Sequence, residues 1–127
     1  MTNEIPMIKY PKKIYDLRER TAKFGETIIN FAKTISENSV TRPLISQLVR
    51  AGTSVGANYC EADDASTKKD FIYKIGICRR EIKETKHWLR MIIIAVNPLS
   101  QGAQPLINEA QELTLIFSAI INKSKNS

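Results

Sequence analysis

The sequence predicts an all-α fold, an antiparallel up-down-up-down four-helix bundle that forms a single domain over residues 1–127. In four separate segments, apolar residues recur at steps of three and four, as on the buried face of a helix. Turn-forming and capping residues separate these segments, and the short connections favour antiparallel neighbours. No segment alternates apolar and polar residues for long enough to form a strand.

The first helix is expected over residues 13–36, after an N-terminal arm at 1–12 that contains Pro6 and Pro11. The polar run at 36–39 interrupts the apolar spacing and ends this helix. Its buried face is predicted to consist of Ile14, Leu17, Thr21, Phe24, Ile28, Phe31 and Ile35.

The second helix is expected over residues 43–63, with Thr41 as its cap. Its inward residues are predicted to be Leu44, Leu48, Ala51, Val55, Asn58 and Ala62. Gly52 and Gly56 lie one turn apart within it. Because glycine inside a helix costs roughly 1 kcal/mol relative to alanine, this pair predicts that another helix approaches closely here.

The third helix is expected over residues 68–95, because Thr67 followed by Asp70 forms a capping-box pattern and Asn97 followed by Pro98 ends it. Its buried residues are predicted to be Phe71, Ile75, Cys78, Ile82, Thr85, Leu89 and Ile92.

The fourth helix is expected over residues 104–123, with Pro105 in its first turn, where a missing N–H is tolerated. The polar residues 124–127 are expected to be a frayed tail. The inward residues are predicted to be Leu106, Ala110, Leu113, Phe117 and Ile120.

Composition restricts the compartment and the partners. Nineteen Lys and Arg against thirteen Asp and Glu give a net charge of +6, which favours polyanions as partners. The longest apolar run, residues 91–96, is far shorter than the about 20 residues that a membrane-spanning helix needs, so no membrane partner is expected. Without a signal-peptide pattern, Cys60 and Cys78 are expected as free thiols of a cytoplasmic protein.

No combination of residues predicts catalysis, a cofactor or a metal. Glu84 and His87 have the spacing of a dimetal motif, but such a site needs two motifs and His87 is the only histidine. The acidic cluster Glu61, Asp63 and Asp64 lacks the glycine-containing loop of a cation site. No nucleophile, base and orienting group stand at a recognisable spacing, so the protein is expected not to be an enzyme.

Four cations share one flank of the third helix. This basic row consists of Arg79, Lys83, Lys86 and Arg90. A row of cations on a rigid helix can follow a phosphate backbone, which makes these residues the candidate nucleic-acid-binding site. No aromatic residue alternates with them, so phosphate contacts rather than base stacking are expected. The alternative is a solvated face whose charges pair with acids of a neighbouring helix, which is the commoner use of a charge run.

The opposite flank of the third helix is partly apolar and makes its apolar surface wider than one bundle core requires. Ile77, Trp88 and Met91 are therefore the candidate oligomer interface, and the alternative is that the fourth helix or the arm covers them. Glu81 and Glu84 lie on the same flank, where an unpaired carboxylate is costly.

Polar residues on or near the core face need partners. Arg50 of the second helix is the expected partner of Glu81 or Glu84, in a structural role that fixes the register of the two helices. Asn58 on the second helix likewise needs a hydrogen-bond partner if it is buried.

Several segments between Arg50 and Ile93 together resemble a known family. They are Arg50-Ala-Gly-Thr-Ser-Val-Gly-Ala-Asn58, Glu61-Ala62, Lys68-Lys-Asp-Phe71 and Lys83-Glu-Thr-Lys-His-Trp-Leu-Arg90. The chain resembles the four-helix-bundle family that includes proteins encoded by intervening sequences in bacterial 23S rRNA genes. It departs from the family pattern at Tyr59-Cys60. It also departs at His87, because an aromatic residue, usually Tyr, is common at that position in the family.

The resemblance implies a small cytoplasmic helical protein that assembles as a homopentamer. Its relatives include accessory variability determinants, which bind nucleic acid and a reverse transcriptase, although most members have no established activity. Together with the basic row, this implies a non-enzymatic homo-oligomeric binding or scaffold protein with RNA or DNA as the favoured partner. The alternative is a structural protein–protein interaction module that binds another protein and no nucleic acid.

Overall fold

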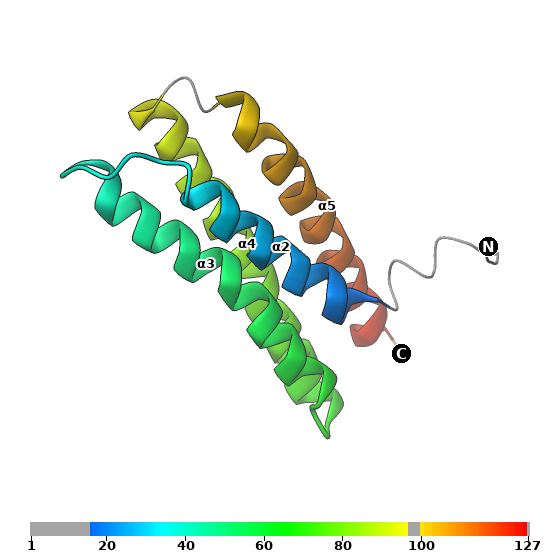
Figure 1. The fold of residues 1–127 in the computed structure, drawn as a ribbon. Helices are drawn as coiled ribbons and strands as arrows, with labels where there is room; N and C mark the ends of the chain where they lie inside the picture. Colours follow the sequence, from blue (N-terminus) through cyan, green and yellow to red (C-terminus); the bar gives the residue numbers. More distant parts are fainter. Residues whose placement is uncertain (1–15, 97–99, 127) are drawn as a thin grey trace, which may run out of the picture.

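The structure, a computed structural model, describes residues 16–96 and 100–126, and these residues form four α-helices and no strand (Figure 1). The helices are α2 (Leu17–Ala32), α3 (Thr41–Asp63), α4 (Lys68–Ala95) and α5 (Ser100–Lys125). Each helix packs against its neighbour in the chain, and α2 also meets α5, which closes the bundle. The prediction of an all-α antiparallel four-helix bundle is confirmed.

The four helices bury one continuous apolar core. Its members occupy the positions expected from steps of three and four, such as Phe24, Leu48, Ile82 and Phe117. At the end of α5 the expected position is wrong by one residue: Ile121 is buried and Ile120 is only half-buried. Because a helical face continues equally well by a step of three or of four from Phe117, the spacing alone does not choose between them.

The helix α2 ends at Ala32, four residues earlier than expected. Residues 33–35 form turns instead, with the N–H of Ile35 donating to the carbonyl of Ala32. Ile35 nevertheless packs into the core and is only 5% exposed. Because it is buried like the helical residues before it, the apolar spacing continued past the end of the helix. The arm predicted at 1–12 and the start predicted at residue 13 lie outside the described residues.

The predicted cap of α3 is wrong, since Asn38 rather than Thr41 performs this role. The Asn38 side-chain carbonyl accepts hydrogen bonds from the N–H groups of Val40 and Thr41, both at 2.9 Å. Thr41 is the first residue of the helix and is buried. Its hydroxyl donates to the carbonyl of Ser36 and accepts from the N–H of Asn38, which ties the connection to the helix.

The bounds of α4 agree with the prediction, and the Thr67 hydroxyl accepts the N–H of Asp70 at 3.1 Å as the capping pattern requires. The helix α5 starts at Ser100, so Pro105 lies in its second turn and not in its first. The helix continues to Lys125. The frayed tail predicted at 124–127 is therefore wrong for residues 124 and 125, which are helical.

The glycines of α3 mark the close contact with α2 that the sequence predicted. A Cβ atom on Gly52 would lie 2.8 Å from Cγ2 of Ile28, and one on Gly56 would lie 3.3 Å from the carbonyl oxygen of Thr21. Both distances are shorter than an ordinary van der Waals contact, so the two helices approach more closely than alanine would allow.

Candidate nucleic-acid interface

The helix α4 carries Glu81 and Glu84 on one flank and the basic row on another. Glu81 and Glu84 face α3, where the guanidinium of Arg50 forms ion pairs with both. The Arg50 Nη1 to Glu81 Oε1 distance is 3.2 Å. The indole N–H of Trp88 donates to the same Glu84 oxygen at 3.4 Å. The partner expected for these carboxylates is therefore present, and one guanidinium serves both of them.

Asn58 has a local role instead of one between helices. Its side-chain N–H donates to the carbonyl of Ser54, one turn earlier in α3, at 2.9 Å. Asn58 is half-buried, so water solvates its side-chain amide only in part. The hydrogen bond to Ser54 supplies the partner that this amide needs.

The basic row on α4 faces α5. Arg79 donates to the hydroxyl of Ser118 at 3.2 Å, and the ammonium of Lys86 donates to the side-chain carbonyl of Gln111. Lys83 and Arg90 are exposed, whereas Arg79 and Lys86 are half-buried. Both bonds leave the positive charge uncompensated, because a hydroxyl and an amide are neutral acceptors.

The antiparallel register explains why the row meets no acid. With Arg79 opposite Ser118 and Lys86 opposite Gln111, Lys83 falls opposite Thr114 and Arg90 opposite Ile107. These four α5 residues share one flank and none carries a charge: Ile107, Gln111, Thr114 and Ser118. Within residues 16–96 and 100–126, no member of the basic row forms an ion pair.

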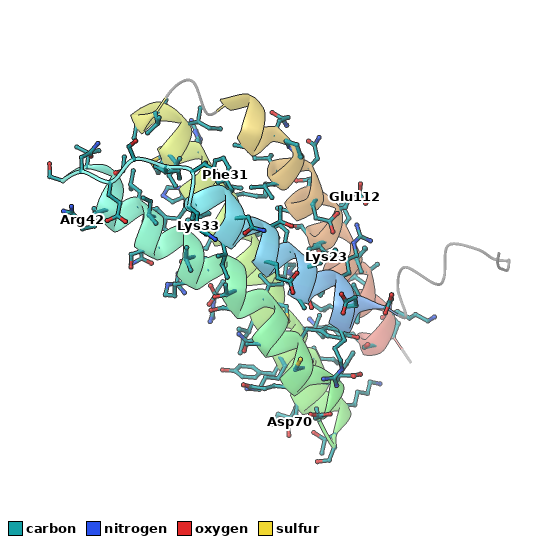
Figure 2. The ribbon with its side chains drawn as sticks, viewed as in Figure 1. Lys23, Phe31, Lys33, Arg42, Asp70 and Glu112 are labelled. Atoms are coloured by element: carbon teal, nitrogen blue, oxygen red, sulfur yellow. The ribbon has the colours of Figure 1, made fainter. Side chains whose placement is uncertain are left out.

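The acids of α5 point to α2 instead. Arg20 binds Glu109 with two hydrogen bonds of 2.7 and 2.8 Å and reaches Glu112, which Figure 2 labels, at 2.8 Å. The hydrogen bonds with Glu109 raise the pKa of Arg20 above its ordinary value. This ion-pair cluster joins α2 to α5 and keeps both carboxylates away from the basic row.

Further cations extend the basic surface towards the other end of α4. Lys68, Lys69 and Lys125 surround Ile72 where the start of α4 meets the end of α5. From Lys68 to Arg90 the helix is about 33 Å long at 1.5 Å per residue. Positive charge therefore recurs along nearly the whole contact between α4 and α5.

A hollow that the sequence did not predict lies beside the basic row. It has a volume of about 490 Å³. Its polar lining consists of Lys83, Lys86, His87 and Arg90, and its apolar lining of Ile93, Ile94 and Ile107. Because Ile107 comes from α5, the hollow depends on the register of two helices and on no single segment of sequence.

The candidate oligomer interface is half-buried in the single chain. Ile77, Trp88 and Met91 each retain part of their surface, and Trp88 packs against the core as well. The single chain does not test their role in assembly, which stays a prediction.

The other residues considered for chemistry have structural surroundings. Glu61 pairs with Lys74 of α4, and Asp63 pairs with Arg18 of α2 at 2.7 Å. Burial raises the pKa of the Cys78 thiol to about 12, so it stays protonated and unreactive at neutral pH. His87 makes an edge-on contact with Trp88, with ring centroids 4.9 Å apart.

Among the described helices, none has an apolar stretch sufficient to cross a bilayer.

Comparisons with known proteins agree with the fold. A family model described as 23S rRNA-intervening sequence protein matches residues 13–119. Among solved structures, a protein of unknown function from Bacteroides thetaiotaomicron VPI-5482, of the S23 ribosomal protein family, is similar with 29% identity and a TM-score of 0.75. The match covers 82% of this chain and 96% of that one. No curated protein matches.

Proposed function

This chain belongs to the 23S rRNA-intervening sequence protein family, and we propose that it is a cytoplasmic, non-enzymatic protein that binds nucleic acid through the basic row of α4. The observation that carries the proposal is the separation of charge on α4. Glu81 and Glu84 pair with Arg50 of α3, whereas the basic row faces an uncharged flank of α5. Unpaired cations at a partly exposed surface are available to phosphates.

The dimensions of the row suit a phosphate backbone. From Arg79 to Arg90 the helix rises about 16 Å, and one strand of a duplex presents a phosphate every 3.4 Å or so along its axis. The row therefore spans about five phosphates. Contacts of this kind do not read the sequence, so we expect binding with little sequence preference.

We also propose that the chains self-associate, as the homopentamer that the family resemblance implies. The half-buried flank of Ile77, Trp88 and Met91 supports this, because tryptophan is frequent at the energetic centre of interfaces. Five chains at +6 each would carry +30, which strengthens attraction to any polyanion.

Light scattering at micromolar concentration is expected to give about five times the chain mass of 14.4 kDa. Met91→Lys places a charge in the proposed interface and is expected to dissociate the assembly, because an unpaired buried charge is costly. The matched control is Val40→Lys in the connection before α3, where the side chain is already 61% exposed. A monomeric native protein would contradict self-association.

Charge reversal tests nucleic-acid binding. The double variant Lys83→Glu/Lys86→Glu removes two phosphate contacts and adds repulsion, so we expect affinity for a 20-nucleotide RNA at 100 mM salt to fall at least about 20-fold. Fluorescence anisotropy of the labelled RNA measures the loss, and light scattering on the same samples checks that the assembly is retained.

The matched control is Lys23→Glu/Lys33→Glu, which changes the net charge equally at Lys23 of α2 and at Lys33 directly after it. Both lysines are exposed, and both belong to the segment of α2 rather than to α4 (Figure 2). If the two double variants weaken binding equally, net charge and not the basic row holds the RNA. If the native protein binds neither RNA nor DNA at about 50 mM salt, where electrostatic binding is strong, the alternative of a protein–protein interaction module replaces this proposal.

A further inference from the structure

The hollow beside the basic row is lined by both cationic and apolar side chains, and the surface of a duplex is not complementary to this combination. Lys83, Lys86 and Arg90 offer charge, while the isoleucines offer apolar area. Ile94 is 79% exposed, the highest exposure among the large apolar residues of the described chain. The outer surface of a duplex presents phosphates and sugars, which would leave Ile94 either uncovered or against a polar group.

His87 stands within this hollow, between the cations that precede and follow it on α4. Its ring is held edge-on by Trp88 at a centroid distance of 4.9 Å and an interplanar angle of 74°. Trp88 is itself fixed through the hydrogen bond to Glu84. The hollow thus contains an aromatic ring in a supported position, in contrast to the expectation from sequence that no aromatic accompanies the cations.

We infer that this hollow receives an unpaired base of a single strand, with the flanking phosphates on Lys83, Lys86 and Arg90. The inference rests on the proposed function and makes it more specific. Histidine is among the side chains on which splayed bases stack in single-stranded RNA. Ile94 and Ile107 supply apolar surface beside it. The volume of about 490 Å³ lies within the range of small-ligand sites.

The experiment compares three probes at about 50 mM salt by fluorescence anisotropy: a mixed-sequence 20-nucleotide single-stranded DNA, its duplex, and an abasic strand with the same phosphates. We expect the native protein to bind the single strand about tenfold more tightly than the abasic strand, since stacking contributes per base. We also expect it to prefer the single strand to the duplex. Phosphate attraction alone gives the opposite order, because the duplex has the higher charge density.

Two variants of exposed residues test the hollow itself. His87→Ala and Ile94→Ser are each expected to reduce single-strand affinity towards that of the abasic strand. His87→Phe, which keeps an aromatic ring, is expected to retain the preference for the single strand. Thermal unfolding of each variant confirms that the fold is intact.

The outcomes separate the inference from the proposed function. Equal binding of single strand, abasic strand and duplex overturns the base site and leaves phosphate binding in place. Binding of no probe overturns the proposed function as well. An anionic lipid surface also combines negative charge with apolar groups. If the native protein binds phosphatidylserine vesicles, Ile94→Ser abolishes that binding, and single strands are not preferred, the inference is also overturned.

Discussion

Affinity for a single strand is expected to fall about 50-fold when salt rises from 50 to 200 mM, if each chain engages the strand through the four cations of the basic row. The reason is that each phosphate contact releases condensed counterions, so the logarithm of the binding constant falls with the logarithm of salt by about 0.7 per contact. Four contacts give a slope of about −2.8 for each chain that touches the strand. Anisotropy titrations at several salt concentrations measure it.

Single neutralisations locate these contacts. Lys83→Gln removes one exposed cation of the row and is expected to change the slope by about 0.7. Lys23→Gln on α2 is the matched control and is expected to leave the slope unchanged. A native slope near zero would mean that phosphate neutralisation contributes little to binding, and a change with Lys23→Gln as large as that with Lys83→Gln would assign the contacts to a different surface.

The sequence was sufficient for the fold because each helix carries its own apolar spacing. It was most accurate at α4, where Thr67 and Asp70, only three positions apart, form the cap. It was least accurate where burial continues without a helix: Ile35 lies in a turn and is still packed into the core. Periodicity reports which side of the chain is buried, and it does not by itself report the hydrogen bonds that end a helix.

The candidate site was predictable only in part. The spacing of the basic row placed its four cations on one flank, but whether acids would neutralise them depended on the facing helix. The register that sets Arg79 against Ser118 is a property of two helices packed together. The partner that occupies Glu109 is Arg20, which is 89 positions away in the chain. Contacts over such separations leave no local pattern, which is also why the hollow was missed.

The glycines of α3 show how a local signal can indicate a contact between helices. At Gly52 the three nearest atoms to an added Cβ all belong to the branched stem of Ile28, at 2.8 to 3.1 Å. Ile28 is fully buried and cannot move aside. At Gly76 on α4, by contrast, an added Cβ would meet nothing within 4 Å.

Alanine at these two glycines is therefore expected to change stability in opposite directions. Overpacking costs about 1–3 kcal/mol, and alanine recovers up to about 1 kcal/mol of helix propensity, so Gly52→Ala is expected to lower the free energy of unfolding by about 1–2 kcal/mol. Gly76→Ala meets no atom and is expected to raise it by about 0.5–1 kcal/mol. Urea denaturation at one fixed protein concentration measures both, because assembly makes stability depend on concentration.

The two changes in the free energy of unfolding, compared with each other, test how closely α2 and α3 approach. If Gly52→Ala is as stable as Gly76→Ala, then α2 and α3 do not approach as closely as the structure places them, and the glycines of α3 need another explanation. If both variants are destabilised, Gly76 lies against a surface outside the single chain. That surface would be a neighbouring subunit, and the same measurement would then support self-association.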